Sequence, residues 1–298
     1  MGREKEATTV LPSRDGMRQF PLSDEEFNRV RELAYQMAGI SLGPHKRDMV
    51  YSRLVRRLRA LGMESFRDYL ALVERGGGEK QSFINALTTN LTYFFREEHH
   101  FPLLVRHVKE RASRGGGVRL WSAAASTGEE PYSMAMAVVD AFGSMSPPVR
   151  LLATDLDTDV LNRAQAGVYP MESVNRLSPE MLRRFFLRGT GRFNGQARVR
   201  PELQRLITFR SLNLLADRWE VEAPVDAIFC RNVMIYFDKA TQRRVLERFT
   251  EVLAPDGLLF MGHAESLQQA SDLVRPLGQT VYALTPQAAA RAAGRYSG

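Results

Sequence analysis

The feature that most constrains the fold is the regular alternation of short apolar runs and helical segments from residue 118 onward. Each apolar run has the length of a strand, and the segment after it carries apolar residues at helical spacing. Alternation of this kind predicts a parallel, doubly wound α/β sheet. The predicted strands are Val118–Trp121, Val149–Thr154, Ala227–Cys230 and Leu258–Met261, and the helices between them begin at Pro131 or span Thr158–Ala166 and Lys239–Leu253.

Two segments depart from this alternation. The last strand-like run, Thr280–Ala283, follows Gly278, and we expect it to pair antiparallel. Residues 187–210 hold several glycines and short alternating runs such as Ala197–Arg200, without a helical period. This composition predicts a small antiparallel β insertion in the α/β domain.

A helical region precedes the α/β domain. Ser23 and Glu26 form a capping box at the start of a helix, and a second helix is predicted over Lys46–Leu61. We therefore divide the chain into a small all-helical domain over residues 20–88 and an α/β domain over residues 89–290. The apolar stripe of the second helix is Val50, Leu54, Leu58 and Leu61, and further helical patterns cover Phe66–Val73, Phe83–Leu87 and Glu97–Arg114.

The composition restricts where the protein works. No apolar run approaches the ~20 residues of a membrane span, so we expect no membrane insertion. The polar N-terminal stretch lacks the apolar core of a secretory signal. The single cysteine, Cys230, excludes an internal disulfide and suits a reducing cytoplasm.

Positive charge is concentrated in one segment. The chain carries a net charge of +7, and residues 46–59 hold six basic residues against Asp48, a local charge of +5. Lys46, Arg53 and Arg57 fall near one face of the predicted helix, without acidic partners four residues away. We interpret this face as a docking surface for an acidic partner, although such a charge run is more often a solvated face.

A loop of small residues follows the first strand. Residues 122–126 and Gly128 have side chains too small to keep a ligand from the backbone, and Pro131 suits the first turn of a helix. A strand, a small-residue loop and a helix start form the nucleotide-binding corner of a doubly wound sheet. The alanines and the lack of a G-x-G-x-x-G pattern argue against a loop that grips a pyrophosphate. The alternative is a tight turn without a ligand.

The second strand ends in carboxylates. Asp155 at its tip is suited to accept both hydrogens of a ribose diol, whereas Asp157 is placed to cap the next helix. These features favour a ligand with an adenosine ribose and no phosphates. S-adenosylmethionine fits, and its cationic sulfonium and amino groups suit a nearby carboxylate, Glu129 or Glu130.

The sequence lacks the motifs that several other types of site require. The sequence offers no P-loop, no zinc-ligand cluster and no serine nucleophile elbow. His99 and His100 are adjacent on a predicted helix and point to different faces, which is poor geometry for a metal. We therefore interpret both as helix-surface residues and expect no metal.

The third predicted strand ends in a polar and aromatic segment, residues 231–237. The carboxyl end of this strand lines the crevice of a doubly wound sheet. Asn232 is followed by Val233 and Met234, and not by the Pro-Pro-aromatic motif of enzymes that methylate amino groups of nucleic acids. By position alone, Tyr236 and Phe237 could equally be packing residues.

Four blocks of sequence carry a resemblance to a known family. They are TNLTYFFRE (89–97), WSAAASTGEEPYS (121–133), TDLDTDVL (154–161) and FCRNVMIYFD (229–238). Through these blocks, and from about Leu22 to Ala283, the chain resembles the chemotaxis receptor glutamate methyltransferases, the CheR family. The resemblance implies that Arg96 and Tyr236 lie at the methyl-transfer centre and that the cofactor is surrounded by Asn90, Thr92, Arg96, Glu130, Asp155, Asn213, Leu214, Arg231 and Asn232.

The resemblance also implies an activity and a compartment. Members of this family transfer a methyl group from S-adenosylmethionine to glutamate side chains of bacterial chemoreceptors, giving methyl esters and S-adenosylhomocysteine. A glutamate carboxyl group, with a pKa of about 4.3, is ionised at neutral pH, so the transfer needs no general base. Arg96 is suited to orient this carboxylate, and Tyr236 to steer the substrate and the methyl group. We expect a cytoplasmic monomer.

Two docking surfaces follow from the same resemblance. It implies that the helix over residues 46–61 meets the acidic methylation region of a receptor coiled coil. The loop GTGRFNG, with Gly189, Gly191 and Gly195, resembles the short glycine loop of members that tether to a pentapeptide at a receptor's C-terminus. The alternative for this loop is a purely structural hairpin.

Two other functions compete with this interpretation. The net positive charge suggests a nucleic-acid methyltransferase, but the confined charge and the missing Pro-Pro-aromatic motif argue against a nucleic-acid partner. The second alternative is a degenerate methyltransferase fold that serves as a receptor adaptor. Arg96, Asp155 and Tyr236 are all present, so nothing points to lost catalysis.

Overall fold

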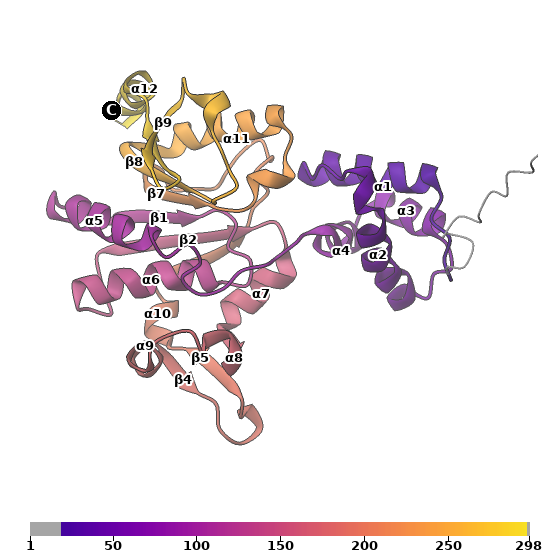
Figure 1. The fold of residues 1–298 in the computed structure, drawn as a ribbon, viewed down its shortest axis with the longest axis horizontal. Helices are drawn as coiled ribbons and strands as arrows, with labels where there is room; N and C mark the ends of the chain where they lie inside the picture. Colours follow the sequence, from indigo (N-terminus) through magenta and orange to yellow (C-terminus); the bar gives the residue numbers. More distant parts are fainter. Residues whose placement is uncertain (1–18, 297–298) are drawn as a thin grey trace, which may run out of the picture. The chain divides into compact units, whose positions relative to one another are not determined.

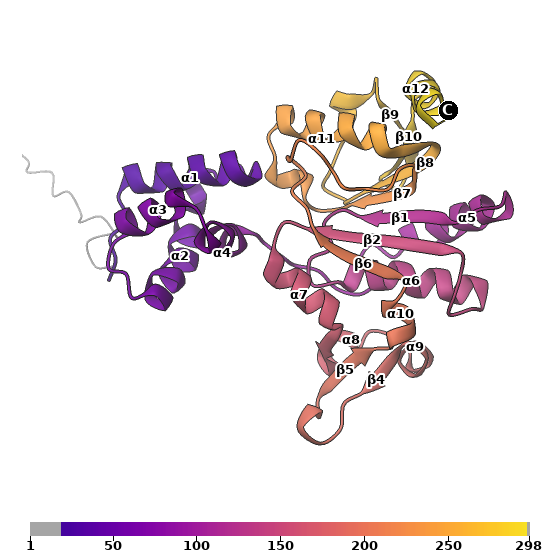
Figure 2. The same ribbon diagram turned by 180° about the vertical axis from the view of Figure 1, so that it is seen from behind.

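The computed structural model describes residues 19–296, which form two compact units (Figures 1 and 2). The first unit is helical and comprises residues 19–36 and 42–87. The second is an α/β unit that comprises residues 37–41 and 88–296. The prediction about a secretory signal concerns residues 1–16, which lie outside the described part of the chain. Within that described part, every helix is too short or too polar to cross a bilayer.

The helical unit is built as its caps and apolar spacing predict. The capping box is confirmed, because the Ser23 amide donates to Glu26 Oε2 (2.8 Å) and the Glu26 amide donates to Ser23 Oγ (3.1 Å). Its elements are α1 (Asp24–Ala38), η2 (Pro44–Lys46), α2 (Arg47–Leu61), α3 (Phe66–Arg75) and α4 (Gly78–Leu87).

The core of this unit includes one face of α2. Val50, Leu54 and Leu58 are fully buried, as their spacing predicts. Leu61 was predicted to continue this stripe, and that prediction is wrong, because its side chain is 41% exposed. Leu61 is the last residue of α2, and Gly62 in the left-handed conformation (φ 64°) turns the chain away directly after it.

The α/β unit contains the predicted doubly wound sheet. Its strand order is β6-β2-β1-β7-β8-β10-β9, and the first five of these strands are parallel. The run near the C-terminus pairs antiparallel with β8, as predicted. The strands are β1 (Val118–Ser122), β2 (Val149–Asp155), β6 (Ile207–Ser211), β7 (Val225–Cys230), β8 (Leu253–Met261), β9 (Val274–Gly278) and β10 (Val281–Leu284).

Helices cover both faces of this sheet (Figure 1). Alternate residues of β1 point to opposite faces, so Leu120 joins the core under α5 and α6, whereas Trp121 joins the core under α11 and α12. The helices are α5 (His100–Ser113), α6 (Glu129–Phe142), α7 (Thr158–Ala166), α11 (Lys239–Val252) and α12 (Pro286–Tyr296). The predicted start of α5 at Glu97 is wrong, because Phe95 and Glu97 adopt positive φ (55° and 54°), which interrupts a right-handed helix.

The small antiparallel insertion is also present, with strand order β3-β5-β4. Its position differs from the predicted residues 187–210. Ile207–Ser211 pairs in parallel with β2 and so belongs to the main sheet, while Val168–Pro170 joins the small one. The half-polar composition of Ile207–Ser211 is that of an edge strand, which explains why it was grouped with the insertion. The insertion comprises β3 (Val168–Pro170), α8 (Met171–Val174), α9 (Pro179–Phe185), β4 (Phe186–Arg188), η3 (Gly191–Phe193), β5 (Gln196–Val199) and α10 (Pro201–Gln204).

Candidate functional site

The carboxyl ends of the five parallel strands meet at one edge of the sheet (Figure 2). The chain runs outward from β1 to β2 and β6 on one side, and to β7 and β8 on the other. The direction in which the chain adds strands therefore reverses between β1 and β7. Ligands of open α/β sheets bind at such a topological switch point. Most of the predicted cofactor residues follow one of these strand ends.

The loop after β1 is fixed from both sides. The Ala123 amide donates to the Phe229 carbonyl of β7 (2.8 Å), and the Ala125 amide donates to the Thr154 carbonyl of β2 (2.9 Å). Gly128, with φ 98°, is the N-cap of α6. A Cβ there would lie 2.8 Å from both the Ala164 Cβ and the Tyr169 hydroxyl, so only glycine allows α6 to begin this close to α7.

Asp155 ends β2 beside this loop and is half-buried. One carboxylate oxygen accepts the Ser126 amide (2.8 Å), and the other accepts the Asp157 amide (2.9 Å). Burial raises the pKa of Asp155 to about 6. Each carboxylate oxygen can accept more than one hydrogen bond, so both retain capacity for the two hydroxyls of a diol. Asp155 therefore fits the ribose of an adenosine cofactor.

Asp157 is confirmed as a helix cap. Its Oδ1 accepts the amides of Asp159 (2.9 Å) and Val160 (3.3 Å) at the start of α7. Its Oδ2 accepts the Thr88 hydroxyl (2.7 Å) and the side-chain amide of Asn90 (2.8 Å). The second carboxylate of this turn thus fixes Asn90, one of the predicted cofactor residues, at the strand edge.

Glu130 and Arg231 form a buried ion pair across the change of direction in the sheet. Arg231 Nε donates to Glu130 Oε2 (2.7 Å), and the two side chains are 2% and 8% exposed, respectively. Ser122 Oγ donates to the other Glu130 oxygen (2.7 Å). Arg231 Nη1 donates to the Arg96 carbonyl (2.7 Å) and lies 3.1 Å from Nδ1 of His100.

His100 was predicted to lie on a helix surface, and this is wrong, because its side chain is fully buried. Burial lowers the pKa of His100 to about 4, so its ring is neutral. Its Nε2 lies 2.9 Å from the Gln279 carbonyl in the turn between β9 and β10. Nε2 therefore carries the proton and Nδ1 accepts from Arg231. No local pattern around His100 predicts this role, because its partner at residue 279 is remote in the chain.

Glu129 differs from its neighbour Glu130 in its partners. Its Oε2 accepts the Thr127 hydroxyl (2.7 Å), and within residues 19–296 it forms no ion pair. Burial raises the pKa of Glu129. Of the two carboxylates, Glu130 has a buried cation beside it, and Glu129 has none.

Glu265 is a further residue of this edge that was not singled out from the sequence. Its buried carboxylate accepts the amides of Asn232 (2.9 Å), Met234 (2.7 Å) and Gly262 (2.6 Å). Burial raises the pKa of Glu265. Asn232 adopts a positive φ of 60°, and these hydrogen bonds hold it there. The only available signal was an acidic residue shortly after the fourth predicted strand.

The remaining predicted residues lie in segments around the same edge. Arg96 donates from Nη1 to the Leu91 carbonyl (2.7 Å), and its guanidinium lies 6.0 Å from the Tyr93 ring centroid. Tyr236 ends η4 (Met234–Tyr236), directly after the segment that Glu265 holds. Thr92 is half-buried, Leu214 is a core residue, and Asn213 donates to the Met37 carbonyl (2.8 Å).

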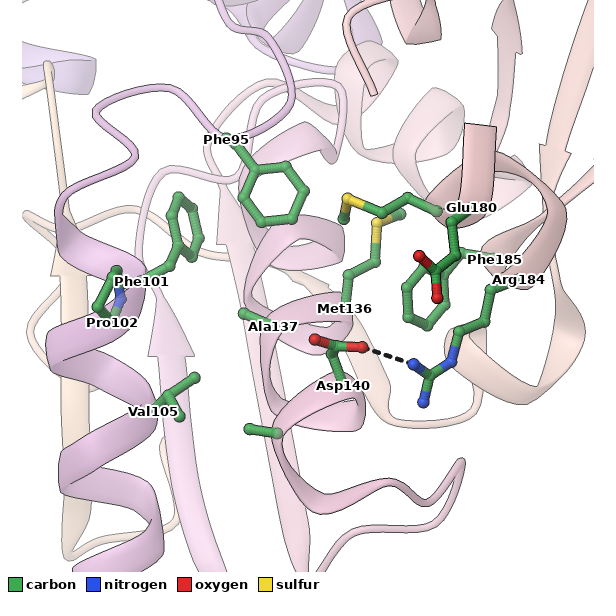
Figure 3. Close-up of a pocket in the computed structure, with 12 residues that line it drawn as sticks. Phe95, Phe101, Pro102, Val105, Met136, Ala137, Asp140, Glu180, Arg184 and Phe185 are labelled. Atoms are coloured by element: carbon green, nitrogen blue, oxygen red, sulfur yellow. Dashed lines mark hydrogen bonds and ion pairs between the residues drawn. The ribbon is translucent and has the colours of Figure 1, made fainter. Parts of the chain in front are cut away.

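A separate pocket of about 460 Å³ lies between α5, α6 and α9 (Figure 3). Phe95, Phe101 and Phe185 line it, and the ion pair of Asp140 with Arg184 lies beside them. None of the predicted cofactor residues lines this pocket, so it is distinct from the strand edge.

The predicted docking residues have defined roles inside their own units. Lys46 is exposed, but Arg53 donates to the Leu87 carbonyl (2.9 Å) at the end of α4. Arg57 pairs with Glu79 of α4 (2.6 Å), so its acidic partner comes from another helix. In the insertion, Gly191 and Gly195 adopt positive φ (56° and 81°).

The fold and this strand edge define a doubly wound methyltransferase with an S-adenosylmethionine-binding domain. The chain belongs to the CheR methyltransferase family. Residues 90–283 match the profile of the "CheR methyltransferase, SAM binding domain", and residues 25–88 match the "CheR methyltransferase, all-alpha domain".

Similar proteins carry corresponding names. "Chemotaxis protein methyltransferase 2" of Pseudomonas aeruginosa is 54% identical over 90% of this chain and 95% of its own length. "Chemotaxis protein methyltransferase" of Escherichia coli is 54% identical over 89% of this chain and 92% of its own length. A solved TehB-like methyltransferase from Corynebacterium glutamicum is 13% identical, over 64% of this chain and 70% of that one. Its TM-score of 0.32 is too low to support an assignment.

The buried ion pair gives a matched test of the two neighbouring glutamates. Glu130→Gln is expected to lower the free energy of unfolding by about 3 kcal/mol, because Arg231 would keep a buried charge without its counter-ion. Glu129→Gln is expected to cost far less, since it removes a buried carboxylate that has no ion pair. Urea denaturation followed by circular dichroism measures both. Equal losses would contradict the structural role of the Glu130–Arg231 pair.

Proposed function

We propose that this protein transfers a methyl group from S-adenosylmethionine to glutamate side chains of bacterial chemoreceptors, giving glutamate methyl esters during chemotaxis adaptation. The observation that carries the proposal is the strand edge in a chain of this family, where the half-buried Asp155 borders a loop of small residues. The chemoreceptor domains that carry these glutamates are cytoplasmic, so we propose that the enzyme acts in the cytoplasm. We also propose that it acts as a monomer.

We propose Asn90, Thr92, Arg96, Glu130, Asp155, Asn213, Leu214, Arg231 and Asn232 as the residues around the cofactor. When bound, S-adenosylmethionine supplies the methyl group, carried as an electrophile on its sulfonium. Asp155 accepts the ribose hydroxyls through the free capacity of its two oxygens. Glu130 balances the charge of Arg231 and keeps that side chain in place. Glu129, which forms no ion pair within the described chain, is the alternative to Glu130 as the carboxylate nearest the cofactor's cationic groups.

Arg96 and Tyr236 are the residues we place at the substrate. The incoming glutamate is ionised at neutral pH, so the site has to orient a carboxylate and need not remove a proton. Arg96 keeps guanidinium donors beyond the one used by the Leu91 carbonyl, and these suit a carboxylate. Tyr236 is half-buried at the end of a segment that Glu265 holds rigidly, which suits a positioning role for its hydroxyl and ring.

The direct test is incubation with methyl-labelled S-adenosylmethionine and purified chemoreceptors, followed by mass spectrometry of the modified residues. Base-labile label on glutamate is the expected result. Label on another residue type, or none on any receptor, would contradict the proposed function.

We also propose that the helical domain docks the receptor through α2. Lys46 and Arg56 are exposed, whereas Arg53 and Arg57 are partly engaged with α4. The exposed charges are therefore the ones free to meet an acidic receptor helix, and Arg53 and Arg57 contribute to the positive potential beside them.

The insertion is proposed as a tether for the C-terminal pentapeptide of a receptor. β5 is the central strand of the small sheet, so β4 has one edge without a strand partner among the described residues. An extended peptide can add to such an edge through main-chain hydrogen bonds. Gly189, Gly191 and Gly195 shape the loop between β4 and β5, and a side chain at Gly189 would clash with the Phe193 carbonyl.

Asp155→Asn is expected to weaken S-adenosylmethionine binding at least about tenfold, because charged acceptors contribute roughly 1.5–3 kcal/mol. Binding to the unaltered protein should also weaken as pH falls through about 6, because protonation then removes the charged acceptor. Titration calorimetry between about pH 5 and about pH 8 measures both effects. Asp159→Asn, at an exposed site in the same turn, is the control. Unchanged affinity in Asp155→Asn would exclude Asp155 as the ribose ligand.

Tyr236→Phe is expected to lower kcat while cofactor affinity stays within a few fold. The substitution removes only the hydroxyl, and the backbone carbonyl that accepts the Ser41 amide (2.9 Å) is retained. Receptor methylation rates and cofactor titration separate the two quantities. Equal turnover would show that the hydroxyl has no part in the reaction.

Reversing exposed charge at the N-cap of α2 and on α2 itself, with Lys46→Glu and Arg56→Glu, is expected to slow receptor methylation without changing cofactor affinity. The defect should shrink as salt rises, because exposed charges are screened over about 8–10 Å at physiological ionic strength. Arg75→Glu with Lys80→Glu changes the net charge equally at other exposed sites of the same unit. If both double variants slow methylation alike, net charge and not α2 sets the rate.

Replacing Gly191 and Gly195 with valine is expected to abolish binding of a receptor C-terminal peptide, because both positions need positive φ. We expect the unaltered protein to bind this peptide with a Kd on the order of 1 μM, measured by fluorescence anisotropy. Cofactor affinity of the variant is the control for folding. Failure of the unaltered protein to bind any receptor tail would make the insertion a structural hairpin.

A further inference from the structure

Glu97, His99 and His263 gather beside the strand edge, and the proposed reaction uses none of them. Each offers one ligand atom, and these atoms all lie within 4.8 Å of one another. Glu97 and His99 come from the turn before α5, whereas His263 follows the end of β8. The rings of His99 and His263 meet edge to face, with centroids 6.0 Å apart. The three side chains thus converge from two segments that are far apart in the sequence.

Two of these three residues carry a buried polar atom without a hydrogen-bond partner. The atoms are Oε2 of Glu97 and Nε2 of His99. The other Glu97 oxygen accepts the His263 amide (3.2 Å) and lies 3.4 Å from the Asn232 side-chain amide. Leaving a buried polar atom unpaired costs about 1–3 kcal/mol, so two such atoms in one cluster of residues indicate a missing partner.

The backbone adds to this argument. Glu97 adopts a positive φ of 54°, a strained conformation for a residue other than glycine. Strain of this kind persists where the surrounding structure enforces it, and it clusters at binding sites. Here the strained residue is itself one of the three candidate ligands.

We propose that Glu97, His99 and His263 form a binding site for a divalent transition-metal ion of the Zn²⁺ class. Two imidazole nitrogens and one carboxylate oxygen are ligands that Zn²⁺ and neighbouring first-row ions accept. Three protein ligands leave a fourth position for water or another small ligand. The absence of thiolate ligands sets the site apart from closed structural zinc sites, since Cys230 is buried in the β7 core.

The spacing requires only a modest adjustment. Bonds of about 2.1 Å to a shared tetrahedral ion place ligand atoms about 3.4 Å apart, so side chains must move inward by roughly 1 Å. His263 is the exposed member and has room to make this movement. The sequence analysis expected no metal, and this proposal departs from that expectation at His99. His100 is buried in the core and is not one of the proposed ligands.

The test uses the untagged full-length protein, stripped of metal by dialysis against a chelator and titrated with Zn²⁺ in a calorimeter. About one ion per chain is expected. His263→Ala should weaken Zn²⁺ binding at least about tenfold, because even an outer-shell partner of a ligand contributes that much. His45→Ala, which removes another exposed histidine in the helical unit, should leave binding unchanged.

A second measurement uses absorption spectroscopy in place of calorimetry. Co²⁺ in place of Zn²⁺ should give visible absorption bands that His263→Ala and Glu97→Gln both lose, while circular dichroism shows that the variants are folded. The proposal is overturned if the unaltered protein binds Zn²⁺ no more tightly than His263→Ala. It is equally overturned if His45→Ala loses as much affinity as His263→Ala. Neither measurement uses methyl transfer, so the result is independent of the proposed function.

Discussion

The buried ion pair between Glu130 and Arg231 is the contact on which the construction of the site most depends. A charge held away from water is tolerated only when its partner and its remaining hydrogen bonds are in place. Glu130 belongs to the helix after β1, and Arg231 follows β7, so the pair joins the two strands between which the sheet changes direction. Because Arg231 also binds the Arg96 carbonyl, the same contact fixes the segment that leads into α5.

The carboxylates at this edge have two kinds of role. Glu265 and Asp157 are occupied by backbone amides, and with them they set the shape of the loop after β7 and the start of α7. Asp155 and Glu129 are less completely engaged, and burial raises the pKa of each. A group that is costly to keep charged, yet retains acceptor capacity, is suited to gain from a polar or cationic ligand. Glu265 and Asp157 thus shape the backbone of this edge, and Asp155 and Glu129 are carboxylates that we propose as available to a cofactor.

The sequence predicted the structural features that are determined by residues close together in the chain. Apolar runs bounded by turns predicted the main strands, and the Ser23 capping box and the Asp157 cap follow from the spacing of their own residues. The burial of His100 and the role of Glu265 were not predictable, because their partners lie far away in the chain. The strand Ile207–Ser211 was missed since an edge strand is only half apolar. The roles of Arg96 and Tyr236 rested on resemblance, and they remain proposals.

The contact between His100 and the turn after β9 has a consequence for how the protein is made. Translation proceeds from the N-terminus, so Arg231 leaves the ribosome well before residues 274–284, which form the hairpin of β9 and β10. Until Gln279 emerges, His100 lacks the carbonyl that orients its ring, and Met261 lacks its backbone partner at Thr280. A nascent chain therefore contains every residue of the proposed cofactor site before it contains the hairpin that completes their arrangement. A truncated product without this late hairpin would contain the residues of the strand edge but would lack the contacts that position His100 and Met261.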